Sequence, residues 1–146
     1  MRKASSEREQ KIREKIISDA SQAPFNQYIG LEFIEMNPNY GKTRIKFREE
    51  VLNTYKTIHG GALLALADVS AGMTASMCGY YVTTVASSLN FLLPAKDTEY
   101  IYCECLKLKT GKHISVFDIR ITDDKGNLLD SGEFSFFTSK TSVLEG

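Results

Sequence analysis

One long apolar segment, from about His59 to Met77, constrains the fold of this chain more than any other feature. Its Leu, Ala, Val and Met residues predict a buried helix, and Gly79 after it is consistent with a left-handed cap. Beyond Gly79 the sequence changes to strand-like alternation. Because the strands need an apolar partner for one face, a sheet wrapped around a single central helix is the economical arrangement.

The remaining elements follow from turn residues and from the spacing of apolar residues. A helix is expected from Ser5 to Ala20, capped by Ser5 or Ser6 and ended by Pro24. Strands are expected over six ranges: Leu31–Met36, Thr43–Phe47, Tyr81–Leu93, Glu99–Leu108, His113–Thr122 and Leu128–Thr138. This order of helix, two strands, buried helix and four strands predicts an α+β fold with one large antiparallel sheet.

The central helix has two different apolar faces, which suggests that it is covered on more than one side. Large residues form one face: Leu63, Leu66, Val69, Met73 and Met77. Smaller residues form the other: Gly61, Ala65, Asp68, Gly72 and Ala75. The small face leaves room near Asp68 for a ligand or a second chain, although close packing of helix and sheet selects small residues too.

Composition places the chain among ordinary globular proteins. It has 146 residues, a formal net charge of zero, 42% hydrophobic and 25% charged residues, so neither nucleic acid nor a membrane surface is favoured as a partner. The expected division is an N-terminal helix over 1–22, one domain over 23–140 and a frayed tail over 141–146. The charged N-terminus lacks a signal-peptide core, which predicts a cytoplasmic protein.

The three cysteines do not form a metal-binding pattern. Cys103 and Cys105 are two apart in an expected strand and should share a face, but no CxxC spacing occurs. Both histidines lie far away in the sequence, so no metal site is predicted. Reduced cysteines are the simpler interpretation for a cytoplasmic chain.

Two residue choices in the apolar segment oppose helix stability. Glycine at Gly60 or Gly61 costs about 1 kcal/mol relative to alanine within a helix, and a buried unpaired Asp68 is unfavourable or protonates. Amide groups at a helix start lack intrahelical partners and carry positive partial charge. The combination suggests a site that needs free N–H groups and a carboxylate, although the glycines could serve only a tight entry turn.

The sequence resembles the hotdog-fold acyl-CoA thioesterases of the phenylacetate-pathway, or PaaI-like, type. The likeness covers roughly Phe25 to Thr138 and rests on six pieces: Asn53, His59-Gly60-Gly61, Leu66-Ala67-Asp68, Asn90-Phe91-Leu92-Leu93-Pro94-Ala95, Leu108-Lys109-Thr110-Gly111-Lys112 and Asp124-Lys125-Gly126. The family often has a glycine shortly before the His-Gly-Gly motif, where this chain has residues 55–58 without one. The sequence therefore does not predict the conformation of this loop.

The resemblance implies a hotdog fold, to which the expected N-terminal helix is an addition, and it implies catalytic roles. It assigns the oxyanion-binding amide to Gly60, and the nucleophile or general base for thioester hydrolysis to Asp68. Asn53 would orient water or the carboxylate, and His59 would polarise the carbonyl or hold the loop. A hydroxyl is also implied, with Thr84 as the candidate and Ser87 and Ser88 as rivals.

Simpler interpretations exist for each of these residues. Asp68 could be satisfied by a hydroxyl such as that of Ser70, or exposed at a cleft. Asn53 could be a turn-forming residue, and His59 could be structural.

Coenzyme A would enter as part of the substrate. Gly61 at the helix start and the turn with Lys109, Gly111, Lys112 and His113 are candidate binding residues, because cations beside a turn pair with phosphate groups. A solvated basic turn explains the same residues. The acyl group stays open, and no metal, redox cofactor or prosthetic group is implied.

Helix geometry predicts a second subunit. His59 and Asp68 are nine residues apart, so they lie about 13 Å apart along a helix and about half a turn out of phase. They cannot act on one carbonyl from the same helix. We therefore expect a two-fold homodimer with two composite sites, and the resemblance implies a dimer or a dimer of dimers.

Two other functions fit part of the pattern. A hydratase or dehydratase on the same fold would pair His59 with a carboxylate for proton transfer at carbon. A non-catalytic acyl-CoA-binding domain is the second, although a carboxylate is a poor choice in a pocket that only binds a thioester. Hydrolysis of acyl-CoA to free acid and coenzyme A is the function that the motifs favour.

Overall fold

The computed structural model describes residues 6–145, so Ser5, with the rest of the 1–5 segment, and Gly146 lie outside it. The helices are α1 (Glu7–Gln22), α2 (Pro24–Ile29) and α3 (Gly60–Ser76), with a short 3₁₀ turn at Glu49–Val51. The strands are β1 (Glu32–Asn37), β2 (Tyr40–Lys46), β3 (Tyr80–Phe91), β4 (Tyr100–Thr110), β5 (Ile114–Asp123) and β6 (Leu128–Ser142). The expected order of elements is confirmed.

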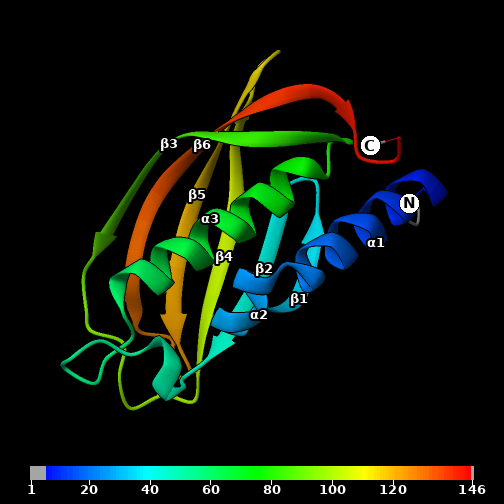
Figure 1. The fold of residues 1–146 in the computed structure, drawn as a ribbon. Coiled ribbons are helices and arrows are strands. Elements are labelled where there is room, and N and C mark those ends of the chain that lie inside the picture. Colours follow the sequence, from blue (N-terminus) through cyan, green and yellow to red (C-terminus); the bar gives the residue numbers. More distant parts are fainter. Residues whose placement is uncertain (1–5, 146) are drawn as a thin grey trace.

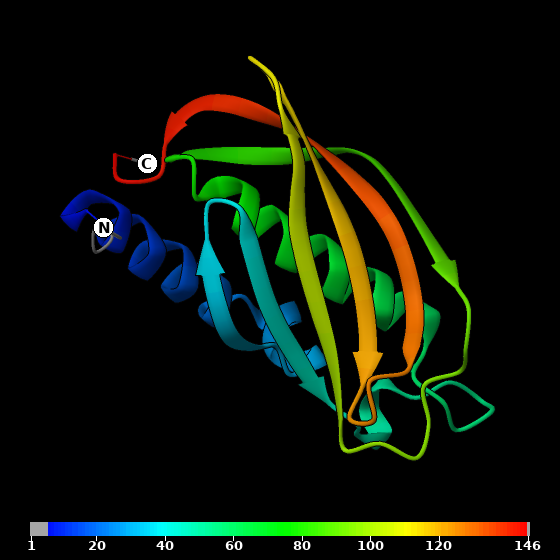
Figure 2. The ribbon, with the colours of Figure 1, turned by 180° about the vertical axis from the view of Figure 1, so that it is seen from behind.

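All six strands form one antiparallel sheet in the order β1-β2-β4-β5-β6-β3. The sheet curves around α3, which lies across its concave face (Figures 1 and 2). Strand β3, which follows α3 in the sequence, is an edge strand of the sheet and pairs with β6. It does not lie beside β4, the next strand in the sequence. The hotdog fold and the extra N-terminal helix are both present.

The core lies between α3 and the concave face of the sheet. Leu63 and Leu66 from the large face of α3 are buried there against inward-facing strand residues, which include Phe117, Ile119, Ile121, Phe134 and Phe136. Helix α3 packs very closely against β2. There is no room for a side chain at Gly41 of β2, since a Cβ there would overlap the hydroxyl oxygen of Thr74 on α3. Ala75, expected on the small face, is buried.

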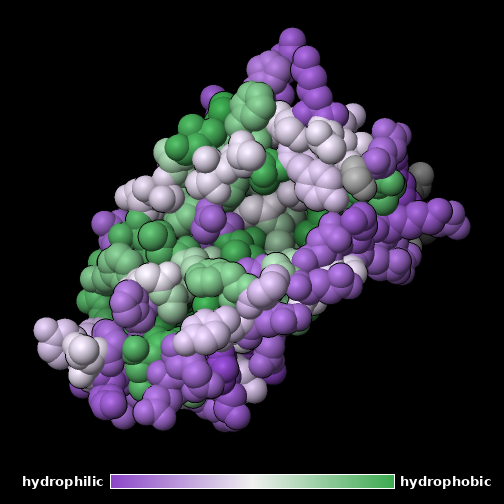
Figure 3. Space-filling model, viewed as in Figure 1, coloured by the Kyte–Doolittle hydropathy of each residue, from purple (hydrophilic) through white to green (hydrophobic). Residues whose placement is uncertain are grey.

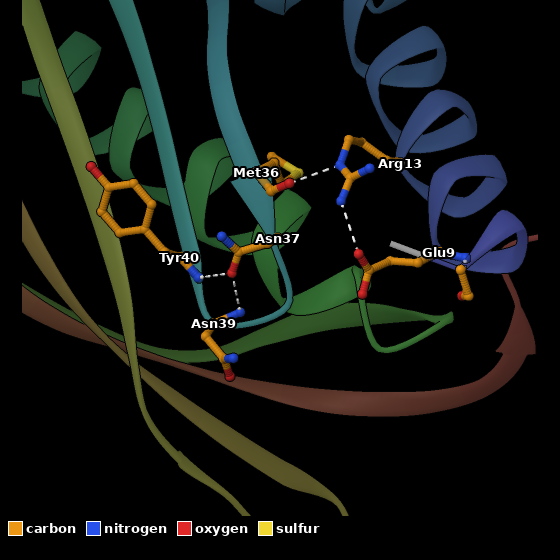
Figure 4. A network of polar contacts seen from close by, with 7 residues as sticks. Glu9, Arg13, Met36, Asn37, Asn39 and Tyr40 are labelled. Carbon is orange, nitrogen blue, oxygen red and sulfur yellow. Dashed lines mark hydrogen bonds and ion pairs between the residues drawn. The ribbon is translucent and has the colours of Figure 1, made fainter. Parts of the chain in front are cut away.

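A second apolar cluster fixes α1 at the other end of α3. It contains Ile12, Ile16, Met36, Met73, Met77 and Val143. Polar contacts add to it, because Arg13 Nε donates to the backbone oxygen of Met36 at 2.8 Å and its Nη2 to Glu9 at 3.1 Å (Figure 4). The hydroxyl of Ser6 caps α1 by accepting from Glu9 N. Helix α1 is thus part of the domain's packing.

Two local expectations differ from the structure. Pro24 ends α1 as expected, but it also occupies the first turn of the short helix α2, where its missing N–H is harmless. The frayed tail expected from residue 141 is not seen up to residue 145: β6 continues to Ser142, and Val143 is fully buried and donates its N–H to Gly79 O at 2.8 Å. Packing against the second cluster orders this segment.

Cys103 and Cys105 share the inner face of β4, as expected, with their sulfur atoms 3.9 Å apart in the core. Among residues 6–145, no group of three or more His, Cys, Asp or Glu side chains is arranged to hold a metal ion. Within the same residues, no helix combines the length and apolar character that crossing a membrane requires.

Candidate active site

The start of α3 leaves one amide group without a partner. His59 is the N-cap, and its ring Nδ1 accepts from Gly61 N at 2.8 Å. The N–H groups of Ala62 and Leu63 both donate to His59 O, at 2.9 and 3.1 Å. Of the first four amides of the helix, only that of Gly60 has no acceptor among the described residues. A developing negative charge in front of Gly60 would meet this free donor and the positive end of the helix.

Space, and not backbone strain, explains the two glycines. A Cβ on Gly60 would lie 3.3 Å from the ring of Phe91, and one on Gly61 would lie 3.0 Å from the His59 Nδ1 that caps it. Because Nδ1 accepts a hydrogen bond, the neutral His59 ring carries its proton on Nε2. The structure therefore gives His59 a definite role in holding the helix start.

Asn53 organises the loop before α3. Its side-chain oxygen accepts from Tyr55 N at 2.9 Å and Thr57 N at 3.2 Å, and its Nδ2 donates to the hydroxyl of Thr57 at 2.8 Å. These are the bonds of a turn-forming asparagine. The same residue nevertheless lines a cavity together with Gly60, so the loop bonds also fix its side chain beside the free amide.

This cavity, which we call the helix-start cavity, has a volume of about 240 Å³. It is lined by Asn53, Thr57, Ile58, Gly60, Leu63, Phe91, Leu92, Leu93, Pro94, Ala95 and Asp130. Most of this wall is apolar. Asp130 is the one ionisable residue in this lining: its side chain is fully buried, and burial raises its pKa to about 7.

Asp68 lies half-buried on the opposite side of α3 from the main core, facing β3. The hydroxyl of Thr84 donates to Asp68 Oδ1 at 2.6 Å. Ser70, the hydroxyl considered for Asp68, instead bonds with Thr43 on the buried side of the helix. The contact with Thr84 orients one carboxylate oxygen, and the other has no hydrogen bond with the described residues.

A β-bulge explains which hydroxyls reach Asp68. The pairing of β3 with β6 shifts between Thr84 and Ala86, so Val85 is the extra residue. As a result Thr84 and Ser87 lie on the same face of β3 and both line the space next to Asp68. Without the bulge, strict alternation would put Thr84 and Ser88 on the same face. Of the three hydroxyls considered from the sequence, Thr84 is the one that contacts Asp68.

A groove runs along α3 beside β3. One part, about 310 Å³, is lined by Gly61, Leu64, Ala65, Asp68, Thr84, Ser87 and Phe134. The next part, about 340 Å³, continues from Asp68 to Gly72 and Ser76 and is closed by Ile16, Asp19 and Ala20 of α1. Figure 3 shows a hollow between α1 and β3 on this face, with hydrophobic residues over the α3 and β3 side. Gly61, Ala65, Asp68 and Gly72 of the small face therefore line open space.

Gly60 and Asp68 do not meet within one chain. They are eight residues apart, about 12 Å along the helix axis, and they line different cavities. The basic turn is further away: Gly111, Lys112 and His113 line a cavity of about 570 Å³ with Cys78 and Tyr80, beyond the C-terminal end of α3. The binding roles expected for that turn and for Lys109 stay predictions.

Phe91 and Asp130 are among the residues of the helix-start cavity that sequence reasoning did not assign to the site. They form a cross-strand pair between β3 and β6. A signal existed for Asp130, because it lies four and six residues before the buried Phe134 and Phe136 and so shares their inward face. Phe91 carried no such signal. The bulge at Val85 changes which face of β3 the later residues occupy, so counting from the start of the strand assigns Phe91 to the wrong face.

Comparison with known proteins identifies the family. A model of the thioesterase superfamily matches residues 55–129, just over half of the chain. The 1,4-dihydroxy-2-naphthoyl-CoA thioesterase 2 of Arabidopsis thaliana is 22% identical over 120 residues, which cover 81% of this chain and 76% of that protein.

Solved structures show the same fold. The PaaI protein of the Escherichia coli phenylacetic acid degradation operon superposes with a TM-score of 0.81 at 18% identity, covering 90% of this chain and 98% of that one. A hypothetical thioesterase of Streptococcus pneumoniae, solved with coenzyme A, gives a TM-score of 0.79 at 23% identity, covering 86% and 98%. The chain therefore belongs to the thioesterase superfamily of thioester hydrolases, as a PaaI-like member with the hotdog fold.

Proposed function

We propose that this protein hydrolyses acyl-CoA thioesters to a free acid and coenzyme A. The observation that carries the proposal is the single free amide of Gly60 at the start of α3, combined with the Asp68 carboxylate oriented by Thr84. The first is an oxyanion donor and the second a base or nucleophile. Coenzyme A as the thiol is supported by the naphthoyl-CoA thioesterase relative and the neighbour solved with coenzyme A.

The complete site needs a second copy of the chain. Strand β3 is long, most of its side chains are exposed, and its outer edge has no strand partner among the described residues. An open edge of this kind favours pairing with another strand. Antiparallel pairing of two β3 strands about a two-fold axis would bring α3 of each subunit alongside the other, with Gly60 of one subunit facing Asp68 of its partner.

In this site the thioester carbonyl oxygen accepts from the Gly60 amide. Asp68 takes a proton from water as the water oxygen attacks the carbonyl carbon, and the negative charge on the carbonyl oxygen is stabilised by the amide. The C–S bond then breaks, and the proton passes from Asp68 to the leaving thiolate. Direct attack by Asp68, with later hydrolysis of the resulting anhydride, uses the same residues. Asn53 and His59 hold the loop and the helix start.

The groove beside β3 is the natural place for the acyl chain. It extends from Asp68 towards α1 along Gly72, and its walls are mainly apolar. Its far end is polar, because the Tyr81 hydroxyl donates to Asp19 there at 3.2 Å. Acyl groups of moderate size fit this shape.

Release of free thiol from a panel of acyl-CoA esters tests the proposal, with Asp68→Asn beside the wild type. The amide oxygen of asparagine still accepts from Thr84, so the variant should fold while its kcat falls about 10²–10⁴-fold. No thiol release by the wild type, or full activity of Asp68→Asn, would refute the proposal.

Mixed dimers test the composite site. Asp68→Asn and Gly60→Pro should each be nearly inactive as homodimers, but a heterodimer of the two has one intact site. Random mixing should therefore restore about a quarter of the wild-type activity. If the mixture stays inactive although heterodimers form, the two groups do not act across an interface.

A further inference from the structure

The carboxyl group of Asp130 is buried and has no hydrogen-bond partner. Its side chain is 0% exposed, and neither carboxyl oxygen bonds with any described residue. Buried polar groups in proteins are nearly always hydrogen-bonded, so an orphan of this kind calls for an explanation. Packing alone does not provide one, because an apolar residue of similar size would fit this wall without the unfavourable burial of a polar group.

The strand register places Asp130 against the helix-start cavity. It pairs with Ile121 of β5 on one side and with Phe91 of β3 on the other, and the buried Ile121 marks the inward face. Phe91 is 55% exposed, and its ring lies against Gly60, because a Cβ built on Gly60 would contact that ring. Asp130 thus lies beside Phe91 in the cavity wall that also contains Gly60 with its free amide.

No other ionisable side chain lines this cavity among the described residues. Two ionisable residues on the flanking elements are His59, whose ring caps α3, and Asp123 at the end of β5. Asp123 already accepts bonds from Lys125 N, Asn127 N and Asn127 Nδ2. Neither supplies a partner for Asp130. The start of α3 contributes a positive partial charge at the same cavity, which favours an ionised carboxylate there.

We propose that Asp130 is a specificity-determining residue, whose carboxyl group accepts a hydrogen bond from an N–H or O–H group of the ligand in the helix-start cavity. This inference rests on the proposed acyl-CoA function. Because Asp130 is fully buried, contact requires a neighbouring side chain to shift, a rearrangement common on binding. The donor has two possible sources: the amide and hydroxyl groups of the pantetheine arm, or a hydroxyl on the acyl chain.

The ionisation of Asp130 gives the proposal its own signature. Because burial raises its pKa to about 7, the carboxyl group is about half protonated at neutral pH. A ligand donor would favour the ionised form, so binding at pH 7 should release up to about half a proton. A purely structural aspartic acid would release none.

Non-hydrolysable thioethers of coenzyme A provide the test, because their binding does not depend on turnover. S-hexyl-CoA carries donors only in its thiol part, and S-(3-hydroxyhexyl)-CoA adds one in the chain. Affinities and proton release are measured by titration calorimetry at pH 7, in two buffers of different ionisation enthalpy. The proteins are wild type, Asp130→Leu, Asp130→Asn and the control Asp118→Asn, whose carboxylate lies on the outer face of β5.

Asp130→Leu should weaken binding by about tenfold to a hundredfold, the effect of losing a hydrogen bond to a charged group. Loss with both ligands assigns the donor to the thiol part, and loss with the hydroxylated ligand alone assigns it to the chain. Asp130→Asn, which keeps the shape, should abolish proton release, and Asp118→Asn should behave as wild type. Unchanged or tighter binding of both thioethers by Asp130→Leu, or proton release from Asp130→Asn equal to that from wild type, overturns the proposal.

The outcome separates this inference from the proposed function. Thiol release from the panel of acyl-CoA esters, hexanoyl-CoA included, is measured on the same proteins. Turnover without any effect of Asp130 on thioether binding refutes the inference alone. Thioether binding that depends on Asp130, without turnover by the wild type, refutes the hydrolase function alone. Absence of thioether binding by the folded wild type refutes the inference.

Discussion

The two ends of α3 differ in how well their polar and apolar groups are satisfied. At the C-terminal end, Met73 and Met77 pack with α1, and the Ser76 hydroxyl donates to Gly72 O at 2.9 Å. At the N-terminal end, the amide of Gly60 is free and the carboxyl group of Asp130 is buried without a partner. One helix thus has a well-packed end and an end with unmet hydrogen-bonding capacity.

The difference indicates where stability and function reside. Unpaired polar groups lower the stability of a fold, so their concentration at one end points to a ligand that completes them. The packed end provides the rigid support that holds this arrangement. Substitutions at the two ends should therefore have opposite signatures, with activity lost at one and stability lost at the other.

Gly60→Pro should give the largest effect. Proline is well tolerated at the first position of a helix, and His59, with φ −59° and ψ 132°, has the backbone conformation required before proline. The substitution removes the N–H and adds the proline ring, and loss of the amide donor should lower kcat for thiol release about 10²–10³-fold with little loss of stability.

Gly60→Ala is the matched control, because it adds the same Cβ near Phe91 and keeps the N–H. Its activity should remain much closer to wild type in the same assay. Equal losses in the two variants would mean that crowding against Phe91, and not the amide, is responsible.

Met77→Ala should show the opposite signature at the packed end. Met77 is 3% exposed in the second apolar cluster, and truncation of a buried methionine costs about 2–5 kcal/mol. Urea unfolding should show this loss, while kcat at a temperature where the variant is folded should match wild type. A fall in kcat at full folding would show that the two ends are coupled.

The buried carboxyl group of Asp130, near the N-terminal end of α3, should make the stability of the protein depend on pH. The pKa of Asp130 is raised to about 7 when folded and lies near 3.9 when unfolded. Between these values the unfolded chain loses the proton first, so the free energy of unfolding should fall by roughly 2–4 kcal/mol as pH rises from about 4 to about 7. Urea unfolding of wild type and Asp130→Asn over this range isolates the contribution; parallel profiles would contradict it.

Ser6→Ala should have the smallest effect. It removes the hydroxyl that caps α1, so the protein should lose about 1 kcal/mol of stability. Thermal unfolding measures the change, with kcat as the second readout. A larger loss of activity than of stability would indicate that α1 acts on the groove beyond its packing role.

Much of the candidate site could be predicted from the sequence, because its signals are local. The His-Gly-Gly start of α3, the Asp68 on its small-residue face and a serine cap of α1 at Ser5 or Ser6 follow from helix periodicity and end preferences. The order of elements follows equally from turn residues between alternating strands. These features need only neighbouring residues, and each is present in the structure.

Tertiary pairing decided the rest. The position of β3 beside β6, the bulge at Val85 that turns Thr84 and Ser87 to the same side, and the burial of Asp130 all depend on strands far apart in the sequence. The same holds for Val143, which is ordered by contacts with Gly79 and the second cluster. Hydrogen-bond register and burial are properties of pairs of distant segments, so a single segment cannot reveal which of its polar groups will be left without a partner.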